Sequence, residues 1–178
     1  CREHNLEEVS TALRGAVREG GLGAALYLSG TPGTGKTASV RQALRHLAAE
    51  EGLPRFRVIE INGMKLSSPH QAYSILWEAL TGQHCAPAKA AAHLERRYSP
   101  PAALKKEPKK TSKREKEPLV LVLDELDYLV TRTQSVIYSL FEWATNGHAA
   151  LIVVGISNTM DLPERLLPRV HSRLGIRR

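Results

Sequence analysis

Residues Leu119 to Leu129 read LVLVLDELDYL, five consecutive apolar residues followed by three carboxylates within four positions. A continuous run of Leu and Val is typical of a strand that is buried on both faces, and its sequence turns polar where the chain leaves the core. Asp124 and Glu125 are therefore predicted to lie at the carboxyl end of a buried strand. Carboxylates crowded there stay ionised when a cation or hydrogen-bond donors compensate them, so a metal site is one candidate explanation.

Short apolar runs alternate with amphipathic segments along the chain of 178 residues, which is long enough for one domain with an ordinary core. We predict strands at Ala25 to Leu28, Phe56 to Asn62, Leu119 to Asp124 and Ala150 to Ile156, and helices from about Asn5, at Thr37 to Ala49, at Pro69 to Leu80 and at Thr133 to Thr145. This alternation predicts an α/β fold with a parallel sheet and helices on both faces.

The net charge of +7 is concentrated in one segment, residues 99–118, with the sequence SPPAALKKEPKKTSKREKEP. This segment holds seven Lys or Arg and three Glu, a balance of +4 that leaves +3 for the rest of the chain. Because it is rich in Pro and Lys and Thr111 is its only β-branched residue, we predict a disordered insertion. A solvated loop and an element that contacts DNA or directs localisation both fit such a charge run, and both interpretations stay open.

The cysteines and the apolar runs indicate the redox state of the compartment and whether the chain crosses a membrane. Cys1 and Cys85 give no disulfide framework, and no histidine pairs with another or with cysteine at metal-ligand spacing, so a reducing compartment is predicted. The longest apolar run, Ala149 to Ile156, is too short to span a bilayer, and no membrane role is predicted.

The stretch Gly30 to Thr37, GTPGTGKT, lies between the first predicted strand and its helix and matches the phosphate-loop pattern GxxxxGK(S/T). Glycines in such a loop let successive amide groups wrap an anion at the positive end of the following helix. The Lys36 ammonium can reach the β- and γ-phosphates, and the Thr37 hydroxyl is placed to ligate the bridging magnesium. A glycine-rich turn could carry the same pattern, but the flanking strand and helix and the acidic motif downstream favour a phosphate loop. The predicted nucleotide-binding residues are Gly30, Thr31, Pro32, Gly33, Thr34, Gly35, Lys36 and Thr37.

The acidic pair is expected beside this loop, because ligands of parallel α/β sheets gather at the carboxyl ends of the strands. Asp124 is predicted to hold Mg²⁺, directly or through water, and Glu125 to polarise the attacking water as a general base. Together the two residues predict hydrolysis. Asp127 is more typical of a solvated or capping carboxylate.

The fourth predicted strand ends at Ser157 and Asn158, which the same geometry brings towards the γ-phosphate. Asn158 is the better candidate for orienting the attacking water, since an amide can donate to the phosphate and accept from water at once. Asn before a turn is also a common turn former, so the functional interpretation depends on its place at the strand end. The residues alone favour solvated side chains for Arg165, Arg169 and Arg173.

With these residues assembled, the chain resembles the initiator clade of the AAA+ ATPases, which includes the largest subunit of the eukaryotic origin recognition complex and its replication-licensing relative. The resemblance covers most of the chain, but the insertion at 99–118 has no assignable counterpart. The resemblance is carried by the stretches CREHNLEEV, GTPGTGKTASV, EINGMKLSSPHQAY, LVLDELDYL, IYSLFEW and SNTMDLPERLLPRVHSRLG. The motifs at the end of this list look most like the largest subunit. The residues that match the family's phosphate-loop lysine, metal aspartate, catalytic glutamate and first sensor are Lys36, Asp124, Glu125 and Asn158.

The resemblance also implies roles for residues outside these motifs. The Ser172-Arg173 pair is similar to the arginine finger, which would make Arg173 a catalytic residue acting on a neighbouring subunit. Arg2 and Glu3 are similar to the stretch that packs near adenine. Residues 63–82 fall where initiators carry an extra helix that approaches DNA. The family continues past the position of Arg178 into a fifth sheet strand, a helical lid and a winged-helix DNA reader, so residues 1–178 are expected to be a partial AAA+ core.

The function that the resemblance implies is that of a nuclear DNA replication initiator that binds and slowly hydrolyses ATP with Mg²⁺, neighbouring subunits completing the site. Its expected partners are other AAA+ subunits of an origin recognition complex, double-stranded DNA, a replication-licensing ATPase and the replicative helicase that it helps to load. An alternative is a subunit that holds ATP as a structural element and turns it over negligibly. A nucleotide kinase is a third reading, but the chain lacks the arginine-rich acceptor lid that a kinase needs.

Deletion of residues 99–118 tests the two interpretations of the basic segment. If the segment contacts DNA, the deletion lowers DNA affinity and flattens its dependence on salt concentration, because fewer counterions are released on binding. The measurement is the DNA dissociation constant of the full protein at several salt concentrations. An unchanged salt slope identifies the segment as a spacer.

Overall fold

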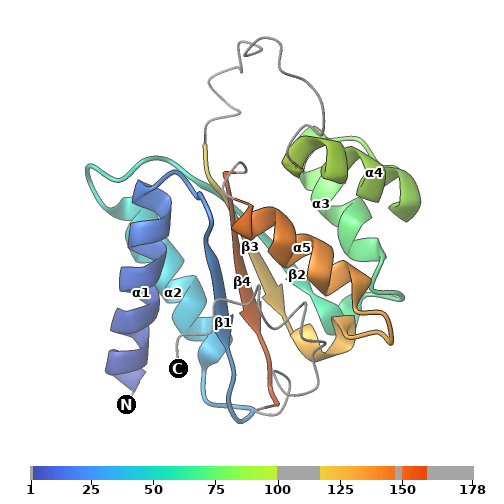
Figure 1. Ribbon diagram of the computed structural model, residues 1–178. Coiled ribbons are helices and arrows are strands. Elements are labelled where there is room, and N and C mark those ends of the chain that lie inside the picture. Colours follow the sequence, from blue (N-terminus) through green and yellow to red (C-terminus); the bar gives the residue numbers. More distant parts are fainter. Residues whose placement is uncertain (1, 100–116, 147–149, 160–178) are drawn as a thin grey trace.

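The computed structural model describes residues 2–99, 117–146 and 150–159, and the side chains of residues 2–6 lie outside the description. Its centre is a four-stranded parallel sheet in the order β1-β4-β3-β2 (Figure 1). The strands are β1 (Ala25–Leu28), β2 (Arg57–Asn62), β3 (Leu119–Asp124) and β4 (Leu151–Ile156). The predicted parallel α/β fold is confirmed.

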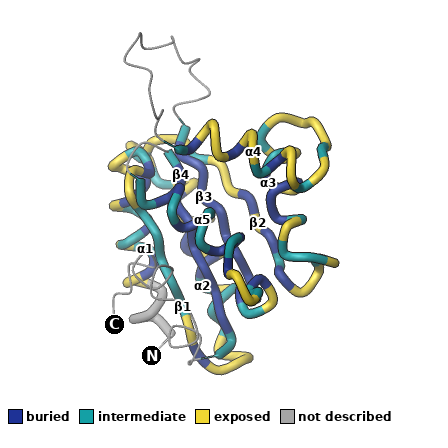
Figure 2. The backbone as a smooth tube through the Cα atoms, turned by 45° about the vertical axis from the view of Figure 1, so that its right-hand side comes forward, coloured by how far each residue is buried: buried dark blue, intermediate teal, exposed yellow. Residues whose placement is uncertain are grey.

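The two central strands, β3 and β4, are buried along their whole length, and Figure 2 shows both in dark blue. Successive side chains of a strand point to opposite faces, so β3 supplies two separate cores. Leu121 and Leu123 belong to the core on one face, whereas Val120 and Val122 belong to the core on the other. The unbroken run of Leu and Val is therefore explained by burial on both faces.

Helices cover both faces of the sheet (Figure 1). On one face lie α1 (Arg2–Arg18) and α2 (Lys36–Ala49), whose apolar residues pack on the core that contains Val120. On the other lie α3 (Gln71–Thr81), α4 (Pro87–Tyr98) and α5 (Ser135–Thr145). Two short 3₁₀ helices, η1 (Gly63–Lys65) and η3 (Leu126–Leu129), follow β2 and β3. No helix among the described residues has the length and apolar character to cross a bilayer.

Helix α4 was absent from the expected elements, and its omission is an error of the sequence-based prediction. Its signals are Pro87 in the first turn and a stripe of buried residues four positions apart, Ala90, Leu94 and Tyr98. The indole Nε1 of Trp143 in α5 also donates to the Glu95 carboxylate at 2.8 Å. The other helices agree closely with their predicted ranges, although α3 begins at Gln71 because the two residues before it form a turn.

Candidate functional site

The carboxyl ends of the neighbouring strands β1, β4 and β3 bring three polar segments to one edge of the sheet (Figure 1). The glycine-rich loop follows β1, the acidic motif begins at the last residue of β3, and Ser157 and Asn158 follow β4. Parallel pairing places these strand ends side by side, because each strand of the sheet runs in the same direction. The convergence expected from the sequence is therefore present.

The glycine-rich loop has the backbone of an anion cradle. Gly33 and Gly35 have φ values of 79° and 85°, a left-handed conformation that favours glycine, and Gly35 is the N-cap of α2. The Lys36 ammonium donates to the carbonyl oxygens of Gly30 at 2.8 Å and Thr31 at 2.9 Å. A full positive charge thus lies across the loop at the amino-terminal end of a helix, and both features favour a bound phosphate.

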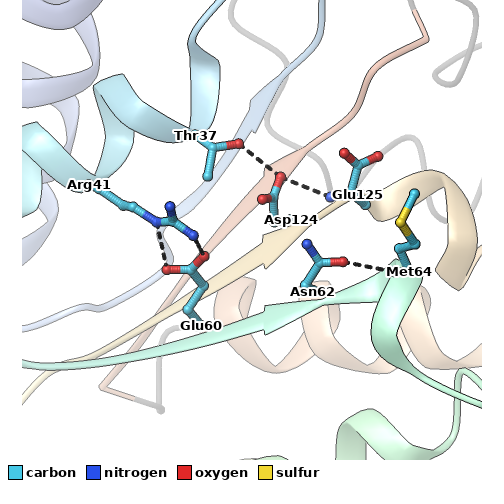
Figure 3. A network of polar contacts seen from close by, with 7 residues as sticks. All are labelled: Thr37, Arg41, Glu60, Asn62, Met64, Asp124 and Glu125. Atoms are coloured by element: carbon cyan, nitrogen blue, oxygen red, sulfur yellow. Dashed lines mark hydrogen bonds and ion pairs between the residues drawn. The ribbon is translucent and has the colours of Figure 1, made fainter. Parts of the chain in front are cut away.

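A hydrogen bond joins this loop to the acidic motif (Figure 3). The Thr37 hydroxyl donates to Asp124 Oδ1 at 3.0 Å, although the two residues are 87 positions apart in the chain. The same carboxylate oxygen accepts the backbone N–H of Glu125 at 3.0 Å, and Asp124 is only 7% exposed. The first turn of α2 and the end of β3 are therefore held in contact by polar groups.

The donor atoms at this contact fit magnesium held together with a phosphate. Thr37 and Asp124 present oxygen atoms, the ligand type that Mg²⁺ prefers. Within the described ranges, no three or more His, Cys, Asp or Glu residues gather into a metal cluster. Mg²⁺ usually takes one or two protein oxygens and completes its shell with water and phosphate oxygens, whereas an all-protein cage needs more ligands. The residues present thus match a nucleotide-associated cation.

Glu125 is held in an unusual conformation directly after the strand. Its φ of 54° and ψ of 50° are left-handed, a backbone geometry that costs a non-glycine residue about 1–3 kcal/mol. Its carboxylate Oε2 accepts a hydrogen bond from the Asn158 side-chain amide at 2.6 Å. The end of β3 and the loop after β4 are therefore linked through Glu125 and Asn158, two of the three side chains for which catalytic roles are predicted.

Gly63, which follows β2, leaves room for the backbone of Glu125. A Cβ atom at Gly63 would lie 2.5 Å from the Glu125 carbonyl oxygen and 3.3 Å from the Tyr128 Cβ. A backbone carbonyl cannot rotate away as a side chain can, so glycine is needed here for space. The sequence prediction missed this role, because no local signal reveals a contact between the turns after two different strands.

Asp127 is engaged with the loop after β4, and the prediction of a solvated or capping carboxylate is wrong. It accepts hydrogen bonds from the Ser157 hydroxyl, the Asn158 backbone N–H and the Thr159 hydroxyl. Burial acts to raise the pKa of Asp127, but the hydrogen bonds from Thr159, Asn158 and Ser157 outweigh it and hold the pKa below its ordinary value. The carboxylate therefore remains ionised at neutral pH.

An ion pair beside the site connects α2 to the edge strand β2 (Figure 3). Arg41 donates to both carboxylate oxygens of Glu60, with Nε at 3.0 Å from Oε2. The hydrogen bond that Arg41 donates to the Glu60 side chain, followed by the negative charge of that carboxylate, raises the pKa of Arg41. Both side chains are partly exposed, so solvent screening limits the contribution of this pair to about 1 kcal/mol.

The structure places some of the predicted site residues and leaves others aside. The phosphate loop, Asp124, Glu125 and Asn158 lie at one edge of the sheet, and their chemical roles stay predictions. Arg2 and Glu3 begin α1, but their side chains lie outside the described part. Also outside the described residues are the basic segment from 100 to 116 and residues Arg165, Arg169, Ser172 and Arg173.

Comparisons with known proteins found matches to both the sequence and the fold of this chain. The family model of the AAA ATPase domain matches residues 1–154. Origin recognition complex subunit 1 of Schizosaccharomyces pombe is 45% identical over 182 aligned residues, which cover 100% of this chain and 24% of the relative. The chain thus spans about a quarter of the length of that relative.

Two solved structures share the fold with recognisable sequence similarity. The structure of Drosophila ORC bound to DNA contains a chain with 40% identity and a TM-score of 0.80, and the match covers 98% of this chain and 46% of that one. The Aeropyrum pernix ORC1 protein in complex with DNA has 27% identity and a TM-score of 0.71, with coverage of 98% and 43%. Both matches extend over almost the whole of this chain.

Replacing Gly63 by alanine tests the close approach of the two turns. We expect Gly63→Ala to lower the free energy of unfolding by about 1–3 kcal/mol, because its Cβ would overlap the Glu125 carbonyl. The matched control is Gly15→Ala in α1, where an added Cβ meets no atom within 4 Å. Alanine in that helix should stabilise by about 0.5–1 kcal/mol. Denaturant titrations measure the free energy of unfolding of both variants. Equal stability of the Gly63 variant and the wild type would contradict the steric account.

Proposed function

Because the chain belongs to the AAA ATPase domain family, we propose that it binds ATP with Mg²⁺ and hydrolyses it as part of a DNA replication initiator. The observation that carries the proposal is the hydrogen bond from Thr37 to Asp124, which joins the phosphate loop to the acidic motif at the end of β3. Similarity to origin recognition complex subunit 1 over the whole chain supports the initiator role.

The phosphate loop and the start of α2 form the proposed binding site for the triphosphate. Amide groups of Gly33 to Lys36 face the phosphates at the helix amino terminus, and the Lys36 ammonium neutralises part of their charge. Thr37 and Asp124 would provide the protein oxygens for the cation, which would supply positive charge to offset that of the phosphates. Arg2 and Glu3, at the start of α1, are proposed to lie near adenine, on the basis of the family resemblance.

Glu125 is the proposed general base. Its carboxylate takes a proton from the attacking water, and the left-handed backbone directs the side chain away from Asp124 (Figure 3). The Asn158 amide donates one N–H to Glu125, and this bond fixes the orientation of the base. The amide keeps its second N–H and its carbonyl oxygen for the γ-phosphate and the attacking water. Asn158 is therefore proposed to align the base with the phosphate.

The proposed assembly is a complex of related AAA+ subunits in the nucleus. Arg173 is proposed to reach the nucleotide of a neighbouring subunit, so that hydrolysis is slow in the isolated chain and faster in the complex. The relatives in solved structures are bound to DNA, and we propose double-stranded origin DNA as a partner of this protein. A replication-licensing ATPase and the replicative helicase complete the proposed set of partners.

Variants of the base and of the loop lysine separate binding from hydrolysis. In the assembled complex, Glu125→Gln should keep ATP affinity within about twofold of wild type and lower kcat by about 10²–10⁴, the contribution of a general base. Lys36→Ala should weaken ATP binding by about 10- to 100-fold, because it removes a charge-assisted contact to the phosphates. Filter binding of labelled ATP and phosphate release measure the two quantities.

The control for the loss of a carboxylate is Glu78→Gln, since Glu78 lies on α3 and contacts His84 instead of the site. Glu78→Gln should leave both the ATP affinity and kcat unchanged. Wild-type turnover in Glu125→Gln would refute the assignment of the base. Tight ATP binding without measurable turnover in the wild-type complex would instead support a subunit that holds ATP as a structural element.

A further inference from the structure

The Asp127 carboxylate holds three consecutive residues of the loop that follows β4. The Ser157 hydroxyl lies 3.0 Å from both carboxylate oxygens, and the Asn158 backbone N–H lies 3.0 Å from Oδ2. The Thr159 hydroxyl donates to Oδ1. Ser157 itself is fully buried, and its backbone N–H donates to the carbonyl of Leu28 in β1 at 2.9 Å. The loop is therefore tied to η3 on one side and to the end of β1 on the other.

These contacts close a ring that includes the side chains of Glu125 and Asn158, two of the predicted catalytic residues. Glu125 and Asp127 belong to the same turn, in which the Tyr128 N–H donates to the Glu125 carbonyl at 3.1 Å. From Asp127 the ring passes through the Asn158 backbone, and it returns from the Asn158 amide to the Glu125 carboxylate at 2.6 Å. The positions of base and amide are thus set relative to one rigid turn.

A role in capping alone does not account for this arrangement. An acid in the first turn of a helix accepts from backbone N–H groups of that same turn, whereas the main partners of Asp127 are 30 to 32 residues away in the chain. An ionised carboxylate offers acceptors only, which matches a loop that presents two hydroxyls and one N–H. The charge and shape of Asp127 are therefore complementary to residues 157–159.

We propose that Asp127 is a positioning residue, which fixes the loop after β4 and through it holds the Asn158 amide against Glu125. The inference rests on the proposed hydrolysis, because it assigns to Asp127 the alignment of the base and the residue that orients it. Asp127 does not touch the nucleotide in this account. Its removal should therefore affect the catalytic step and leave ATP affinity nearly unchanged.

Two substitutions at Asp127 should differ in severity. In Asp127→Asn, the amide oxygen can still accept the Asn158 N–H, and the hydroxyls of Ser157 and Thr159 can rotate to accept from the new NH₂ group. Asp127→Ala removes every acceptor at this position and so breaks the contacts between residue 127 and the loop. We expect kcat in the assembled complex to fall by at least about tenfold in Asp127→Ala, since misplacement by about 1 Å can cost 10²-fold, and to be largely retained in Asp127→Asn. ATP affinity should stay within about twofold of wild type in both.

A double-mutant cycle with Asn158→Ala distinguishes positioning from general stabilisation. If Asp127 acts through Asn158, Asp127→Ala should cause no further loss of kcat once the amide is absent. The kcat of each single variant and of the double variant is measured in the full protein within its complex, with Glu78→Gln as the control for charge removal. An equal fold-loss in both backgrounds would overturn the proposal, and so would a kcat within twofold of wild type for Asp127→Ala.

Hydrogen exchange gives a second readout that requires neither nucleotide nor turnover. Peptides that span residues 157–159 should exchange at least about tenfold faster in Asp127→Ala, because the Asn158 N–H loses its acceptor. The control variant should match the wild type. Unchanged protection would overturn the proposal even if the complex hydrolyses ATP. If the wild-type complex hydrolyses no ATP, the proposed hydrolysis fails, and the exchange rates still decide whether Asp127 holds the loop.

Discussion

The hydrogen bond between the Thr37 hydroxyl and the Asp124 carboxylate is the contact on which the site depends. It joins a loop near the start of the chain to the end of a strand 87 residues later. The parallel sheet makes this meeting possible, because β1, β4 and β3 are neighbours and all end at the same edge. A phosphate loop without the acidic motif beside it would bind anions and offer a cation the Thr37 hydroxyl, but no carboxylate.

The frame around this contact is held by hydrogen bonds and close packing among groups outside the proposed nucleotide site. Glu125 adopts a left-handed backbone that ordinary residues avoid, and surrounding structure must offset its cost of about 1–3 kcal/mol. Gly63 leaves space for the Glu125 carbonyl, and Asp127 ties the loop after β4 to the same turn. The placement of the Glu125 carboxylate, the proposed base, thus depends on three turns that follow three different strands. Preorganisation of this kind is what general base catalysis requires.

Much of the fold was predictable from local sequence, and the roles that were missed at the site share a physical cause. The buried strands are nearly continuous apolar runs, and the phosphate loop is a contiguous pattern, so both carry their signals within a few residues. Helix α4 was missed although Pro87 and the stripe of Ala90, Leu94 and Tyr98 mark it in the sequence. The roles of Gly63 and Asp127 depend on partners far away in the chain, which local patterns do not reveal.

The most direct test of the central claim is the structure of the full protein bound to Mg²⁺ and a non-hydrolysable ATP analogue. Convergence of the loop and the acidic motif predicts phosphate oxygens on the amides of the phosphate loop, and a cation about 2.0–2.1 Å from the Thr37 hydroxyl on the side of Asp124. Triphosphate bound at any other place on the sheet would contradict the account. So would a bound nucleotide whose cation lies away from both Thr37 and Asp124.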